Sequence, residues 1–271
     1  MVNIDSSYNK FLTPPPLRTA TEEKLEILSS MVIHSLSEFD PIHGIFEAKF
    51  TILLRWIDGR LYFNNLRFPP KINALKPTEI SKIWFPFFNF ENTKKKSLSL
   101  IDNKASLKVL RNGDGELSGS HETENKYIFD GYENYVEYRR FYSEELECQF
   151  HLHWYPFDTQ ICYVEVSATE DLQDFIMFGV DSFQYLGPLD LTEFMVRRTD
   201  MKVVNGTLLR VEIVIQRRLL SLVLTAFVPT IILNIIGHMS NYFKEMFFEG
   251  LMSLNVTVTL VLTTMFLRYL Q

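Results

Sequence analysis

Several features that commonly betray a function are missing from this chain of 271 residues. Basic charge is not in excess, because 27 Lys and Arg stand against 33 Asp and Glu, for a formal net charge of −6. This acidic balance excludes the electrostatic footprint of a nucleic-acid-binding protein. The sequence has no recognisable nucleophile–base pair, phosphate-binding loop or closed metal motif, so we expect neither an enzyme nor a bound cofactor. The first residues also lack the apolar core of a signal peptide.

Cysteine is nearly absent, since the chain contains two, Cys148 and Cys162. Two cysteines this close together favour one disulfide and an oxidising compartment. In the chain-entropy model, closing such a loop stabilises the fold by roughly 3 kcal/mol. Apolar and polar residues alternate over 149–154, which predicts a half-buried strand that the following proline ends. The tip of the loop then carries an apolar residue, Phe157, and a charged one, Asp158.

Most of the chain before residue 218 has the pattern of short strands. Segments rich in β-branched and aromatic residues occur at 47–58, 163–167, 183–186, 194–204 and 208–216. Between the last two segments stands Asn205-Gly206-Thr207, which is both a hairpin signal and an N-glycosylation sequon at Asn205. Strands at short spacing without helices between them favour a sandwich over an α/β fold. We expect a mainly β, immunoglobulin-like sandwich of about ten strands over 21–217, after a loose arm over 1–20.

Apolar residues accumulate near the end of the chain. The run 219–239 contains no Lys, Arg, Asp or Glu and has about the length that spans a bilayer. The run 250–267 is apolar but interrupted by Ser, Thr and Asn. One narrow helical face of this second run carries Ser253, Thr257, Leu260 and Thr264. Hydroxyl groups gain nothing from lipid, so this face either packs against a helix or lines a water-filled path. We expect two transmembrane α-helices within 218–271.

The loop CQFHLHWYPFDTQIC resembles the signature loop of the Cys-loop, or pentameric ligand-gated, ion-channel family in its spacing, its Pro-Phe-Asp tip and its Gln-x-Cys ending. Residues 56–61, WIDGRL, resemble the family phrase W-x-D-x-R-L. The run 219–239 also resembles the family's first pore helix, because it follows an Arg and carries Pro229 at a similar spacing. The resemblance implies an extracellular β-sandwich, an anchor of several spans in the plasma membrane, and coupling of the two through Phe157 and Asp158.

The resemblance implies a pore as well. Its lining residues are then the hydroxyl face and Glu249 at the cytosolic mouth, with Leu260 as a hydrophobic gate. It implies a homo- or hetero-pentamer of channel subunits, opened by a small-molecule or ionic agonist and conducting inorganic ions. The family has two further membrane helices, so we expect a fragment that ends after the second one and that lacks its natural start. A ring of Glu249 favours cations, and the Pro-Ala-Arg phrase of the anion channels is absent.

Agonists of the family lie between subunits in a box of aromatic side chains, which this sequence largely lacks. The corresponding positions hold Thr51, Thr169 and Val204, and aromatic residues remain at Phe87, Phe88 and Phe90. Phe87 also replaces the Asp of the family phrase I-W-x-P-D. A cation–π cage needs several aromatic faces around one cation. Acetylcholine or another classical amine is therefore not expected to bind through this chain's own surface.

The run 236–249 is similar to a divergent arthropod branch that includes proton-responsive, zinc-responsive and chloride channels. Since histidine titrates near neutral pH, His151, His153, His121 and Glu122 are candidate sensors of pH or zinc. His151 and His153 lie on one face of the expected strand, which makes them candidates for half a metal site. Surface histidines are the plainer interpretation. Two other functions stay open: a membrane-tethered extracellular binding module without a pore, and a non-conducting accessory subunit.

Overall fold

The computed structural model describes residues 2–4, 8, 14–17, 23–69, 72–94, 105–113, 115–117, 127–240, 242 and 248–270. His121 and Glu122 lie outside the described residues. The chain divides into two compact units. The first comprises 1–151, 160–191 and 196–215, and the second comprises 152–159, 192–195 and 216–271.

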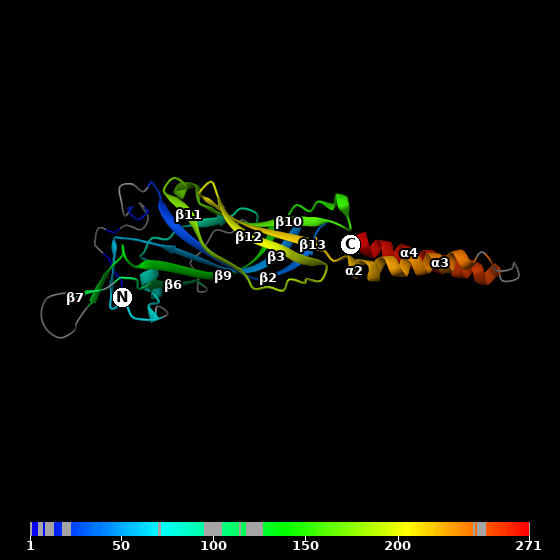
Figure 1. Cartoon of the computed structure of the whole chain (residues 1–271), viewed down its shortest axis with the longest axis horizontal. Helices are drawn as coiled ribbons and strands as arrows, with labels where there is room; N and C mark the ends of the chain where they lie inside the picture. Colours follow the sequence, from blue (N-terminus) through cyan, green and yellow to red (C-terminus); the bar gives the residue numbers. More distant parts are fainter. Residues whose placement is uncertain are drawn as a thin grey trace. The chain divides into compact units, whose positions relative to one another are not determined.

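The largest sheet of the first unit has five strands in the order β11-β2-β3-β9-β6 (Figure 1). Its strands are β2 (Leu25–Asp40), β3 (Ile45–Trp56), β6 (Ala105–Leu110), β9 (Tyr135–Glu147) and β11 (Ile176–Tyr185). The pairs β2–β3 and β3–β9 are antiparallel over most of their length, whereas β11 pairs with β2 in parallel. Alternate residues of β3, from Phe46 to Trp56, are buried, which is the period-two pattern of a strand with one face on a core.

Two four-stranded sheets complete the first unit. One has the order β12-β13-β10-β5, and its strands are β5 (Phe88–Phe90), β10 (Thr159–Ala168), β12 (Phe194–Val204) and β13 (Leu208–Arg217). The other has the order β1-β4-β8-β7, and its strands are β1 (Val2–Ile4), β4 (Leu61–Asn64), β7 (Glu116–Leu117) and β8 (Tyr127–Asp130). A short helix, α1 (Pro77–Ile80), and a 3-10 turn, η3 (Glu170–Leu172), lie between strands.

The core of the sandwich is aromatic where β5 meets the five-stranded sheet. The Phe90 ring contacts Phe50 and Tyr142 at centroid distances of 5.8 and 5.0 Å. The Phe88 ring lies 6.4 Å from Tyr138. Such edge-to-face pairs add about 0.5–1.5 kcal/mol each beyond the burial of their area. The mainly β sandwich predicted from strand spacing is confirmed.

Within the stretch predicted to be a loose arm, residues 2–4 and Tyr8 are bonded to the sandwich. Strand β1 pairs antiparallel with β4. The Tyr8 hydroxyl donates to Asp58 Oδ2 at 3.1 Å and accepts from the backbone N–H of Trp84 at 2.6 Å. Arg60 covers the Tyr8 ring at 4.6 Å and also binds Asp58, whose side chain is buried. The Asp58–Arg60 pair is therefore packed into the fold, with Asp58 buried and Arg60 half-buried.

The second unit contains the helices of both apolar runs. They are α2 (Leu219–Leu222), the π-helical turn η4 (Val223–Phe227), α3 (Val228–Ser240) and α4 (Phe248–Leu270). The wide π turn falls just before Pro229. Proline has no N–H for the carbonyl four residues earlier, and a π turn is a usual way to absorb that defect. Among the described residues, no single helix is both long enough and apolar enough to span a membrane.

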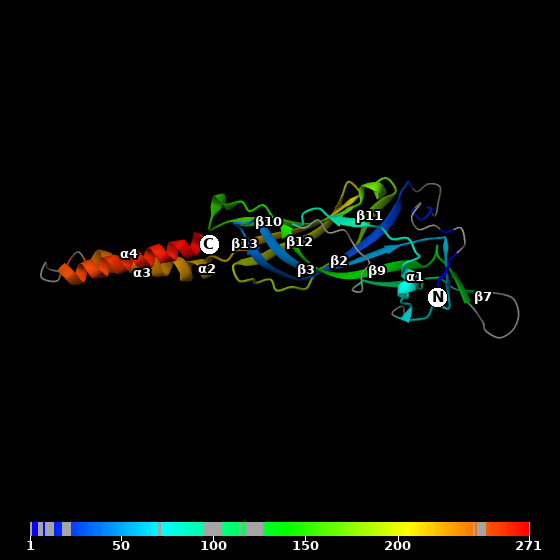
Figure 2. The same cartoon turned by 180° about the vertical axis from the view of Figure 1, so that it is seen from behind.

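Helices α3 and α4 lie side by side in both views (Figure 1 and Figure 2). Gly237 of α3 is the point of close approach. A Cβ at this residue would lie 3.8 Å from Val258 Cγ1 and 4.0 Å from Asn255 Oδ1. The absence of a side chain at Gly237 therefore lets the backbones come close, as small residues do in packed helix pairs.

Candidate functional site

The disulfide loop is present, but its first half is not a strand. Cys148 and Cys162 are bonded, with Cα atoms 5.1 Å apart, within the usual range. Residues 148–151 have no regular structure, and Leu152–Trp154 forms the 3-10 turn η2. The strand predicted over 149–154 is therefore wrong. Alternation of apolar and polar residues indicates a strand only where one face is buried, and here Leu152 and Trp154 are exposed by 45% and 74%.

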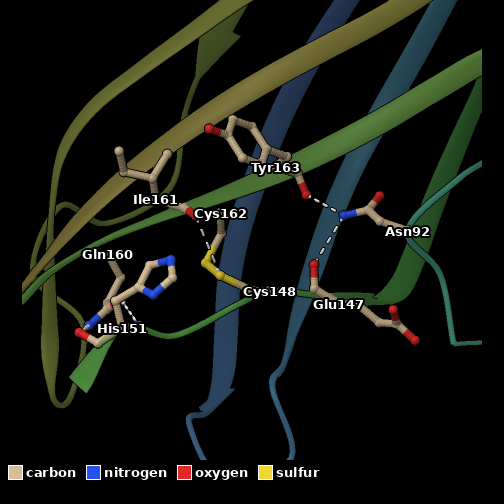
Figure 3. Close-up of a disulfide and its surroundings, with 8 residues drawn as sticks. All are labelled: Asn92, Glu147, Cys148, His151, Gln160, Ile161, Cys162 and Tyr163. Carbon is tan, nitrogen blue, oxygen red and sulfur yellow. Dashed lines mark hydrogen bonds between the residues drawn. A yellow bond between two sulfur atoms is a disulfide. The ribbon is translucent and has the colours of Figure 1, made fainter. Parts of the chain in front are cut away.

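Amide side chains hold the base of the loop (Figure 3). The buried Gln160 side chain accepts a hydrogen bond from the His151 N–H at 2.7 Å and donates to the His151 carbonyl at 3.0 Å. Asn92 donates to the carbonyls of Glu147 and Tyr163 at 3.2 and 2.7 Å. The side-chain amide of Asn92 therefore replaces missing strand pairing beside the disulfide. No local sequence pattern points to Asn92, because its partners lie more than fifty residues away along the chain.

The tip of the loop is organised around a buried ion pair within the second unit. Asp158 Oδ1 lies 2.8 Å from Arg217 Nε, and Asp158 Oδ2 accepts from Arg217 Nη2 at 3.1 Å. The two side chains are exposed by 1% and 8%. The Arg217 guanidinium also stacks on Phe194 and Tyr155, at 4.5 and 4.9 Å from the ring centroids. Arg217 ends β13, two residues before α2 begins at Leu219.

The two residues predicted at the tip thus have opposite environments. Asp158 is buried and paired, whereas the Phe157 side chain is 70% exposed. Glu193 adds a second carboxylate, with Oε2 3.8 Å from Arg217 Nη1, and its carbonyl accepts from the Arg218 N–H at 2.8 Å. A bidentate Arg–carboxylate pair has a fixed geometry, so Asp158 and Arg217 can move only together.

The residues predicted for the agonist box fall into two groups. Phe87 and Thr169 come together, because the Thr169 N–H donates to the Phe87 carbonyl at 3.3 Å. Phe88 and Phe90 are buried in the core, so of the three phenylalanines Phe87, 41% exposed, offers the most accessible ring. Val204 is half-buried at the end of β12.

Thr51 belongs to the other sheet. It lies on β3 between Phe50 and Ile52, which face the core, so its side chain lies on the opposite face of the strand, where it is also buried, with 4% exposed. The Thr51 hydroxyl pairs with His34 Nε2 at 2.8 Å, and the His34 ring packs on Phe141 at 5.6 Å. Arg139 lies on the same outward face, since strand register places Phe141 opposite Thr51 and Arg139 opposite Leu53.

The tip of the β12–β13 hairpin has the predicted turn. Asn205 and Gly206 both have positive φ, +54° and +75°, as a type I′ turn requires. The tip is bonded to the body of the sandwich. The Gly206 carbonyl accepts from the Phe178 N–H at 2.7 Å, and the Thr207 carbonyl accepts from the Ala168 N–H at 3.0 Å. The sequon residue Asn205 is exposed.

The predicted hydroxyl face of α4 is exposed throughout, at Ser253, Thr257, Leu260 and Thr264. Asn255 and Val258, which approach Gly237 of α3, are half-buried and lie on roughly the opposite side of the helix. The hydroxyl of Thr257 donates to the Ser253 carbonyl at 2.7 Å, and that of Thr264 donates to the Val261 carbonyl at 2.8 Å. Glu249 is exposed in the first turn of α4.

The histidine candidates have no support as a metal centre in the described part of the chain. His151 lies in the irregular stretch and His153 in η2, so they do not share a strand face. No group of three or more His, Cys, Asp or Glu side chains that could hold a metal is found among the described residues. The His153 ring packs against Trp154 at 5.3 Å instead.

Comparisons with known proteins agree with this architecture. The family model of the neurotransmitter-gated ion-channel ligand binding domain matches residues 1–197. The chain is 22% identical over 275 residues to the gamma-aminobutyric acid receptor subunit pi of Bos taurus, covering 97% of this chain and 56% of the relative. It is 23% identical over 247 residues to the glutamate-gated chloride channel of Drosophila melanogaster, covering 87% and 49%.

Each of these matches covers most of this chain but a smaller share of the relative. The chain spans about half the length of the curated relatives it matches. The family match, in contrast, covers well over half of the 271 residues and includes the disulfide loop with both cysteines. With the sandwich, the loop and this match in agreement, the chain belongs to the family of neurotransmitter-gated ion-channel ligand-binding domains.

Proposed function

We propose that the chain is a subunit of a pentameric ligand-gated ion channel of the plasma membrane. Residues 21–217 form its extracellular ligand-binding part, and 218–271 supply the first two helices of its pore domain. Agonist binding between extracellular parts opens a pore lined by α4. The observation that carries this proposal is the buried Asp158–Arg217 pair, which joins the tip of the disulfide loop to the residue that leads into α2.

The physical basis of the coupling is the cost of separating that pair. Removing one partner of a buried ion pair leaves an uncompensated charge and costs about 3–5 kcal/mol. A displacement of the loop tip is therefore passed to Arg217 rather than absorbed by breaking the contact. Because Arg217 lies two residues before α2, movement of its side chain displaces the start of the first helix. Phe157 is exposed at the tip, and the loop contacts further elements through this side chain.

The pore proposal rests on the two sides of α4. One side packs on α3 at Gly237, and the other exposes hydroxyl groups and Leu260. Copies of such a helix around a symmetry axis enclose a path with hydroxyl rings, a Leu260 ring that closes it by dewetting, and a Glu249 ring at its mouth. The Glu249 ring favours cations, whereas the named Drosophila relative is a chloride channel.

The agonist site takes one wall from Phe87, Thr169 and Val204 and the other from the outward face around Thr51 of a neighbouring subunit. Phe88 and Phe90 support the first wall from the core. The Arg139 side chain is exposed and forms no ion pair within the described residues. An exposed guanidinium on the same strand face as Thr51 suits an agonist that carries a carboxylate. γ-Aminobutyric acid and glutamate, for which the two relatives are named, are such molecules.

We also propose that Asn205 carries an N-linked glycan. Asn205, Gly206 and Thr207 line a cavity of about 500 Å³, together with residues of β2 and β11. An exposed sequon on a surface turn of an extracellular domain is a suitable acceptor. A glycosidase-sensitive mass shift that is lost in Asn205→Gln and kept in Thr207→Ser tests this assignment.

The channel function is tested by recording currents from cells that express the whole protein. We expect inward or outward current on application of γ-aminobutyric acid, glutamate, protons or zinc, and easier opening in Leu260→Ser. In Asp158→Asn, the evoked current per molecule that reaches the surface should be abolished, whereas in Asp171→Asn, an acid in η3 outside the loop, it should be kept. Reversal potentials after exchange of sodium or chloride assign the ion.

Two results contradict the proposal. Current from Asp158→Asn equal to that of the wild type removes the coupling role. The protein could also reach the cell surface and conduct under none of these conditions, including as the Leu260→Ser variant. That result favours the membrane-tethered binding module or the non-conducting accessory subunit instead.

A further inference from the structure

Tryptophan is distributed unevenly between interior and surface. The chain contains three tryptophans. Trp56 and Trp84 are buried in the sandwich, exposed by 0% and 5%. Trp154, in η2 of the disulfide loop, is 74% exposed. Its indole N–H forms no hydrogen bond within the described residues, and its ring contacts His153. A large amphipathic side chain left in water is a costly arrangement unless something covers it.

Trp154 is part of an exposed apolar patch. Its other members are Leu152, Tyr155 and Phe157, exposed by 45%, 47% and 70%. Residues 149–157 contain no Lys, Arg, Asp or Glu. The next acid along the chain, Asp158, is buried against Arg217 and so adds no charge to this surface, whereas Glu193, 64% exposed and 3.8 Å from the same Arg217, lies outside the loop. The loop tip therefore combines aromatic rings, polar imidazole and indole groups, and no formal charge apart from any on histidine.

The same unit of the structure carries the exposed apolar surface of the first helix. Leu220, Leu224 and Phe227 are exposed by 68%, 58% and 45%, one turn after another from the start of α2. The Asp158–Arg217 pair holds the loop tip at the residue two positions before that helix. The Asp158–Arg217 contact thus links the patch to the first turns of the helix, and both expose apolar side chains.

We propose that the tip of the disulfide loop rests on the lipid bilayer, with Trp154 in the interfacial layer of the outer leaflet. This inference rests on the proposed function, which places the helices in a membrane. Trp and Tyr are enriched at that depth because the ring meets acyl chains while the N–H or O–H meets headgroups and water. The uncharged composition of 149–157 fits this layer, in which an exposed acid or amine would be disfavoured.

The bilayer contact has a consequence for gating. Because Asp158 and Arg217 move together, lipid that holds Trp154 also resists movement of the residue that precedes α2. The loop is then a point at which bilayer composition acts on the channel. A charged residue at position 154 should lower the bilayer's hold on the tip, whereas Phe should keep most of it.

The test uses the emission of Trp154 in the whole protein, reconstituted in vesicles of phosphatidylcholine brominated on its acyl chains near the headgroup. Bromine quenches tryptophan only on contact. The emission of Trp154 is obtained by subtracting the emission of Trp154→Phe from that of the wild type. This subtraction removes the contribution of the other tryptophans. We expect brominated lipid to remove the Trp154 emission, and acrylamide in the water phase to affect it less than it affects a water-exposed tryptophan.

A matched reporter separates lipid contact from simple exposure. Phe68 is 64% exposed and lies in the sandwich unit. In the Trp154→Phe background, Phe68→Trp should be quenched by acrylamide and not by brominated lipid. Leu152→Trp in the same background should be quenched by brominated lipid, which provides a second reporter on the patch.

Trp154 emission that is insensitive to brominated lipid overturns the proposal. If it is then also insensitive to acrylamide, a protein segment covers the residue; if acrylamide quenches it fully, the patch faces water. Either result can occur in a protein that still conducts, so currents from the same sample distinguish failure of this inference from failure of the channel function.

Discussion

At the scale of single residues, the buried acids each have a basic partner. Asp58 is paired with Arg60, Glu137 with Arg55 and Lys108, and Asp158 with Arg217. Burial of a lone carboxylate is expensive, so each pair can be kept only as a unit. These partners are fixed by the fold, because strand register places Arg55 and Lys108 on either side of Glu137.

Glu144 is half-buried and forms no ion pair within the described residues, and its titration gives a prediction. It faces the core opposite Ala48 on β9. Burial raises the pKa of Glu144 above its usual 4.5, although Arg140 opposes the shift. The native state therefore holds this proton more tightly than the unfolded state, and stability falls as pH rises from about 4.5 through the native pKa.

We expect Glu144→Gln to unfold at a higher temperature than the wild type at neutral pH and to lose that advantage in mild acid. Circular dichroism of the purified protein across this range measures it. Glu145→Gln, on the exposed side of the same strand, is the matched control. A constant difference at all pH values would falsify the role of Glu144 ionisation.

Asn92 carries a second residue-scale prediction. Its side chain forms hydrogen bonds to Glu147, Tyr163 and the N–H of Glu165. At about 0.5–1.5 kcal/mol for each net hydrogen bond, Asn92→Ala should destabilise the sandwich by roughly 2–3 kcal/mol. Denaturant unfolding measures this loss, and Asn112→Ala, at an exposed position, serves as control. A loss below that of the control would show that water replaces the amide.

At the scale of elements, local sequence patterns predicted the turn and the helical runs correctly but predicted the wrong structure for the first half of the disulfide loop. The strands β12 and β13 and the turn between them have the predicted positions, because alternation and Asn-Gly chemistry act within a few residues. The loop over 149–154 has the same alternation without a partner strand, and it forms a 3-10 turn. Strand pairing, which lies outside the segment itself, decides between these outcomes.

The hairpin provides the element-scale prediction. Gly206 has φ +75°, so Gly206→Ala should destabilise the protein by about 1 kcal/mol or more, because a Cβ is strained there. Gly250→Ala, in α4 with no atom within 4 Å of the added Cβ, should be neutral or stabilising. Thermal unfolding of the two variants compares them. Equal effects would mean that the turn relaxes to accept alanine.

At the scale of the whole molecule, the two units combine a β-sandwich with a pair of packed helices. One side of α4 is exposed among the described residues, at Ser253, Thr257, Leu260 and Thr264. Symmetric assembly is the arrangement that gives such a surface a role.

Thiol accessibility predicts which side of α4 meets water. The two cysteines of the chain are disulfide-bonded, so an introduced cysteine is the one free thiol of these 271 residues. Cysteine at Thr257 or Thr264 should react with a charged methanethiosulfonate in the assembled protein, and cysteine at Val258, which faces Gly237, should not. Block of current and mass labelling both report the reaction. Equal labelling on both sides would exclude a water-filled path along the hydroxyl face.

The sequence by itself determined the sandwich, the single disulfide, the hairpin turn and the two helical runs. Each of these depends on residue spacing or composition within a short segment. The tertiary structure decided which side chains meet: Asp158 with Arg217, Thr51 with His34, Asn92 with Glu147 and Tyr163, and Tyr8 with Asp58. These contacts join residues that are distant along the chain, and their geometry comes from strand register and core packing, which no local pattern encodes.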